Sequence, residues 1–209
     1  MPDAPVTGPL LLWLLVQLSA LLVACLRLPL AAKYPQPAEM LAAQLVVVAQ
    51  VVAASLLFPY LLRDRRAALA VVASAWPFIA LGGVLSALPA GRVVAAGAYV
   101  TLWLTALAAM RHTLPDRYQP AGVTSASLIT VGTPLLFYLR VEFGNADAIA
   151  IETQRVFEKW MALGPLPAAL LQLSTHSNWR HWMIPTTLLA ASLIALFGAQ
   201  RSRQVIHNS

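Results

Sequence analysis

Long apolar runs separated by short polar turns dominate this chain. Each run has about 20 residues, the length that a helix needs to cross the hydrocarbon of a bilayer. None alternates between apolar and polar side chains as a barrel strand does. Because backbone groups in hydrocarbon must find partners within their own segment, the pattern predicts an all-α, polytopic membrane helix bundle. We expect six transmembrane helices, at about residues 8–28, 39–58, 67–88, 93–110, 123–139 and 179–199.

The composition agrees with this pattern and excludes a water-soluble fold. Hydrophobic residues make up 59% and charged residues 11% of the chain, and the mean hydropathy is +0.72. A soluble protein carries about 25% charged residues because its surface faces water. The six runs and one longer loop take up the 209 residues. We therefore expect a single transmembrane domain over residues 1–209.

The long polar segment lies between the fifth and sixth runs, at residues 140–178. Its first half carries apolar positions at intervals of four and three, as on one side of a helix: Ile149, Thr153, Val156, Trp160 and Leu163. Gly164-Pro165 ends that helix, and the apolar stretch from Leu166 to Leu173 is too short to cross a bilayer. The segment thus predicts short interfacial helices, resting at the outer membrane surface or dipping into it.

Breaks and polar groups inside the runs indicate how the helices pack. Gly132-Thr133-Pro134 should kink the fifth run, which is rich in Ser and Thr. The glutamines at positions 17, 44 and 50 are expected to bridge helices by hydrogen bonds. Small residues four apart, at Gly82–Ser86 and Gly83–Ala87, allow another backbone to approach closely, within the chain or in a dimer.

Basic residues in the short loops predict the orientation. Seven lie on one side of the membrane: Arg63, Arg65, Arg66, Arg111, Arg117, Arg201 and Arg203. Three lie on the other: Arg27, Lys33 and Arg92. Under the positive-inside rule the richer side is cytoplasmic, so we expect a multi-pass protein of the cytoplasmic (inner) membrane with both termini cytoplasmic. Tyr60 and Tyr118 on that side fit an interfacial aromatic belt.

The chemistry of common enzymes and cofactor sites is absent from the sequence. The net charge of +6 is placed at the ends of the runs, where it contacts the lipid bilayer, and we do not expect nucleic acid as a partner. Between their ends the runs hold no Asp or Glu, the residues that usually relay protons or sodium, and Glu39 and Glu142 sit at the margins of runs. No zinc, phosphate-loop or C-x-x-C motif occurs, so we expect no enzyme, cofactor or metal. Leu22 to Cys25 resembles a lipobox, but we expect an ordinary buried thiol at Cys25.

Four residues of the loop region are the candidate contacts for a ligand or partner: Arg140, Trp160, His176 and His181. Arg140 follows the kinked run directly, so it either snorkels to the interface or holds an anionic group. The two histidines are five residues apart, which places them about 140° apart on a helix and argues against a shared metal. They are alternatively a polar anchor at the headgroups.

Two functions fit these observations. Six spans with both ends inside and a helical outer loop resemble, in architecture, the membrane halves of ATP-driven exporters of the ABC-2 type. That resemblance implies a transport (permease-like) subunit that pairs with a separate cytoplasmic ATPase. The alternative is a non-catalytic structural or assembly subunit of a larger membrane complex. Either function implies other membrane subunits or a homodimer as partners.

Overall fold

A computed structural model describes residues 7–31, 41–143, 164–173, 182–183 and 185–195 of the chain. These residues are helical apart from short turns, and they contain no strand. The helices are α1 (Thr7–Ala31), α2 (Leu41–Leu61), α3 (Arg65–Leu85), α4 (Ala90–Thr113), the 3₁₀ turn η2 (Asp116–Tyr118), α5 (Gln119–Phe143), α7 (Pro165–Leu173) and a short apolar helix over Pro185–Ala195. The predicted all-α fold is confirmed for the described residues, and its apolar helices are consistent with a helical membrane protein.

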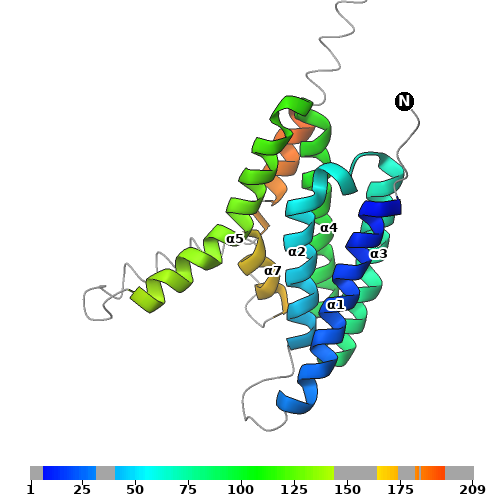
Figure 1. The fold of residues 1–209 in the computed structure, drawn as a ribbon, viewed down its shortest axis with the longest axis vertical. Helices are drawn as coiled ribbons and strands as arrows, with labels where there is room; N and C mark the ends of the chain where they lie inside the picture. The colour runs from blue at the N-terminus through cyan, green and yellow to red at the C-terminus, as the bar shows by residue number, and fades with distance from the viewer. Residues whose placement is uncertain (1–6, 32–40, 144–163, 174–181, 184, 196–209) are drawn as a thin grey trace, which may run out of the picture.

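Helices α1 to α4 form the body of the molecule and run alternately in opposite directions (Figure 1). α2 lies at the centre, packed against α1, α3, α4, α5 and α7. Within the described residues, four helices are long and apolar enough to cross a membrane, over Gly8–Leu26, Ala42–Leu61, Arg66–Leu85 and Ala90–Thr113. α5 is long enough but carries many hydroxyl side chains, and the helix at Pro185–Ala195 is shorter. Four of the six predicted spans are thus supported.

The tight turns follow from local chemistry. Asp64 precedes α3, and its side-chain oxygen accepts the backbone N–H of Ala67 at 2.6 Å, which satisfies one of the free donors at a helix start. α3 ends in a turn in which Leu88 N donates to Gly83 O and Ala87 adopts a positive φ of 48°. Pro89 then starts α4, since proline suits a helix start. These connections leave the helices antiparallel neighbours.

The small residues of α3 pack within the chain. A Cβ on Gly82 would lie 3.2 Å from the Cα of Ala43, so α2 and α3 touch almost backbone to backbone. The backbone N–H of Ala43, in the first turn of α2, donates to the Ser86 hydroxyl at 2.9 Å. The amide of Gln50 donates to the carbonyl of Ala75 at 3.0 Å, a second link from α2 to α3. The predicted close approach and the predicted helix-bridging role of Gln50 are both confirmed. The same prediction is wrong for Gln17, which is fully buried but whose side-chain amide has no hydrogen-bond partner among the described residues.

One prediction is corrected on these helices. Cys25 is exposed, because it lies on the outer face of α1 rather than in a helix interface. The apolar stretch after Gly164 is a short helix, as predicted, and it packs against the other helices. It forms α7, which is buried among α2, α4 and α5 with six of its residues inside: Pro165, Leu166, Ala168, Ala169, Gln172 and Leu173. Burial against three helices removes more apolar surface from water and headgroups than a position at the interface would.

α5 makes room for α7. Pro134 lies inside α5, as the predicted kink requires, and Figure 1 shows the second half of the helix turning away from the bundle. α7 lies beside α2, next to the place where α5 departs (Figure 1). The first half of α5 and the short α7 therefore cover different parts of α2.

Candidate functional site

The four loop residues predicted to contact a ligand or partner are not placed by the described structure. Arg140 belongs to the last turns of α5, but its side chain is not among those described. Trp160, His176 and His181 lie outside the described residues. Their predicted role stays a prediction. The described helices instead present a group of buried polar side chains.

Three of these side chains meet at one point between α2, α4 and α5. The Ser55 hydroxyl of α2 lies 3.2 Å from the indole nitrogen of Trp103 on α4 and 2.9 Å from the hydroxyl of Thr130 on α5. Ser55 and Thr130 are fully buried, and Trp103 is almost so. We call these three residues the Ser55 cluster. It is the polar junction at which the fifth helix joins the core of the bundle.

The direction of each hydrogen bond follows from the chemistry of a hydroxyl. Ser55 has one hydrogen to give, and it donates to the carbonyl of Val51 at 2.8 Å. The indole N–H of Trp103 is a donor only, so it donates to Ser55. Thr130 must then donate to Ser55 as well. One serine oxygen thus accepts from two other helices and has no remaining capacity for a ligand.

An open polar group lies one helical turn from this cluster. Tyr99 precedes Trp103 by four residues, which puts both on the same face of α4. The Tyr99 ring packs edge-on against Trp182 with the centroids 5.4 Å apart. Its hydroxyl is buried and has no hydrogen-bond partner in the described part of the chain. A buried hydroxyl without a partner is costly, and Tyr99 shares this condition with Gln17 and Ser127 among the described residues.

α7 closes the same region of the bundle. It packs against α4 and α2, and less extensively against α5. Its nine residues span about 13 Å, less than half of the hydrocarbon thickness. It begins after Gly164, whose carbonyl accepts the N–H of Ala168 at 2.9 Å. α7 starts and ends within the bundle, and in this it differs from the long helices α1 to α4.

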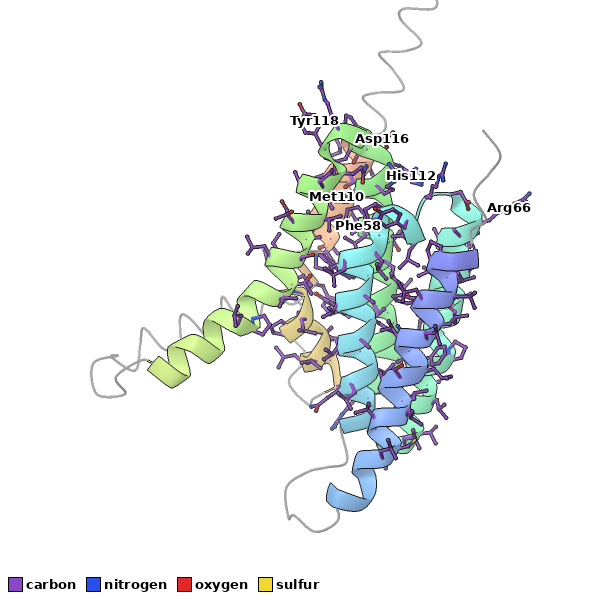
Figure 2. The ribbon with its side chains drawn as sticks, viewed as in Figure 1. Phe58, Arg66, Met110, His112, Asp116 and Tyr118 are labelled. Carbon is purple, nitrogen blue, oxygen red and sulfur yellow. The ribbon has the colours of Figure 1, made fainter. Side chains whose placement is uncertain are left out.

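The opposite half of α2, α4 and α5 is fastened at the basic turns. The guanidinium of Arg111 donates through Nε to the Pro59 carbonyl at 3.3 Å and pairs with Asp116 at 3.2 Å. The Gln119 amide donates to the carbonyls of Arg111 and Leu114 at 3.1 and 2.8 Å. Figure 2 shows Asp116, His112 and Phe58 gathered at this end of the bundle. These contacts join the ends of α2, α4 and α5 at the basic turns.

The described residues hold no group of three potential metal ligands among His, Cys, Asp and Glu. Sequence reasoning missed Ser55, Trp103 and Tyr99, because single polar or amphipathic residues in apolar helices give no pattern. A signal did exist for Thr130, since the hydroxyl-rich fifth run requires partners in hydrocarbon. No family model, no curated protein and no solved structure matches this chain.

Proposed function

We propose that this protein is a transport subunit of the permease type, and that it works with a separate cytoplasmic ATPase. The observation that carries the proposal is α7, a helix too short to cross a bilayer that is nevertheless buried among α2, α4 and α5. Chain breaks at membrane depth occur where they are enclosed by protein or line a cavity, and broken helices are typical of transporters.

The polar groups beside α7 support the same function. The Tyr99 hydroxyl is buried without a described partner, and the Ser55 cluster lies one turn away on the same face of α4. Neither group carries a formal charge, and the Ser55 cluster is satisfied internally, so the polar group that a solute would meet here is the Tyr99 hydroxyl. We propose that α7 shifts relative to α4 to admit a solute to the Tyr99 hydroxyl.

We further propose that α5 and the segment ending in Pro185–Ala195 complete a bundle of six spans. In this arrangement both termini face the cytoplasm, and the protein resides in the inner membrane. The support is the seven-to-three bias of basic residues in the sequence, together with the antiparallel order of α1 to α4.

The experiment compares a strain that lacks this gene with the same strain carrying wild-type or variant copies. Mass spectrometry of cells and culture medium should reveal a compound that is retained in the deletion strain and released again by the wild-type copy. Ala169→Leu overfills the buried face of α7 and should restore release poorly. Val94→Leu, on an exposed face of α4, is the matched control and should behave as wild type.

The loop residues provide a second set of variants. If the outer loop takes part in transport, Arg140→Gln and Trp160→Ala should lower release while the protein still accumulates in the membrane. If the chain is instead a structural subunit, no compound changes in the deletion strain, and a membrane complex loses one of its components. That result would reject the transport proposal in favour of the assembly function.

A further inference from the structure

Exposed arginines gather at the end of the bundle where the α2–α3 and α4–α5 turns meet. Arg63 and Arg66 flank the start of α3, and Arg117 lies in η2 after α4. All three side chains are exposed. Figure 2 shows Arg66, His112 and Tyr118 at this same end. The opposite turn, between α3 and α4, has only Arg92 among the described charged side chains.

The acids at this end are already occupied. Asp64 accepts the N–H of Ala67 as the cap of α3, and Asp116 pairs with Arg111. The Arg111–Asp116 contact is the one ion pair found within the described residues. Arg63, Arg66 and Arg117 therefore have no acidic partner in that part of the chain. Arg63 and Arg66 lie three residues apart at the start of α3, and like charges so close in sequence repel one another unless an anion lies between them.

Exposed tyrosines place this surface at the depth of the lipid headgroups. Tyr60, in the last turn of α2, is 67% exposed, and Tyr118 is 47% exposed. Tyrosine is enriched at membrane interfaces because its ring is apolar and its hydroxyl is hydrated. The guanidinium of Arg117 lies over the Tyr118 ring, 4.6 Å from its centroid. Position and charge thus indicate independently that this end meets phosphate groups.

We propose that Arg63 and Arg66 bind the phosphate of anionic phospholipids in the leaflet that covers this end. Positive charge close to the membrane surface attracts anionic headgroups, whichever basic side chain carries it. A lipid phosphate supplies the negative charge that the chain itself does not provide there. The proposal does not depend on the transport function, since it concerns the membrane face of the two turns.

The test is native mass spectrometry of the full chain, released from neutral detergent with equal amounts of phosphatidylglycerol and phosphatidylcholine. The wild type should retain phosphatidylglycerol preferentially. Arg63→Gln combined with Arg66→Gln should weaken that preference by about fivefold for each arginine removed. Arg92→Gln, at the other end of the bundle, should leave the preference unchanged.

A charge-preserving pair separates binding from folding. Arg63→Lys with Arg66→Lys keeps both positive charges and should retain most of the preference. A wild type that binds the two lipids equally would overturn the proposal, and would leave an acidic protein as the partner for this surface. Equal loss in the Lys and Gln pairs, or equal loss in Arg92→Gln, would also overturn it.

Discussion

At the scale of single residues, Ser55 is the acceptor that α4 and α5 share. Its oxygen receives hydrogen bonds from Trp103 and Thr130, so Ser55→Ala leaves two buried donors without a partner. We expect a loss of about 1–3 kcal/mol in the free energy of unfolding, measured by tryptophan fluorescence during denaturation in detergent. Thr105→Ala, which removes an exposed hydroxyl bonded only to its own helix, should change stability by less than about 0.5 kcal/mol. Equal effects of the two variants would contradict a special role for Ser55.

The glycines of α4 give a second test at this scale. A Cβ on Gly97 would lie 2.7 Å from the ring of Trp76, whose indole N–H donates to Thr101. Gly97→Ala must therefore displace that ring, and we expect a cost of about 1–3 kcal/mol in the same denaturation assay. Gly91→Ala serves as the control, because nothing lies within 4 Å of its Cβ position. The packing between α3 and α4 would be less tight than described if Gly97→Ala were as stable as Gly91→Ala.

At the scale of elements, the position of α7 is the feature that most needs a test. The side chain of Ala169 is fully buried, whereas Ala90 is exposed at the start of α4. In a chain with Cys25→Ser, Ala169→Cys should resist a water-soluble maleimide and Ala90→Cys should react with it. Rapid labelling of Ala169→Cys in the folded protein would show that α7 rests at the interface and not inside the bundle.

At the scale of the whole molecule, the two ends of the bundle differ in charge, and the proposed orientation puts them on opposite sides of the membrane. Arg66 lies at the start of α3 and Ala90 at the start of α4. Because these helices are antiparallel, the two exposed positions are at opposite ends of the bundle. In sealed cells, an impermeant maleimide should label Ala90→Cys, whereas Arg66→Cys should react only after the membrane is opened. Labelling of both variants from the same side would refute the proposed orientation.

The sequence alone determined the helices and the turns between them. Apolar length is a local property, so it locates α1 to α4 without knowledge of any partner. It also indicated that the small residue Gly82 would allow a close helix approach and that Pro134 would kink its helix. The positions of Arg140, Trp160, His176 and His181 in a site stay predictions, because their side chains are not described.

Only the tertiary structure decided which faces meet. In a soluble helix, polar residues mark the outer face, but these helices are apolar nearly all round, since lipid is as apolar as a neighbouring helix. The sequence therefore could not tell that Ser55, Trp103 and Thr130 converge, that Cys25 faces outward, or that α7 lies inside the bundle. Those facts depend on how the side chains of neighbouring helices pack, as at the close contact of Gly82 and where α5 turns away from α2. Such packing exists only in the assembled bundle.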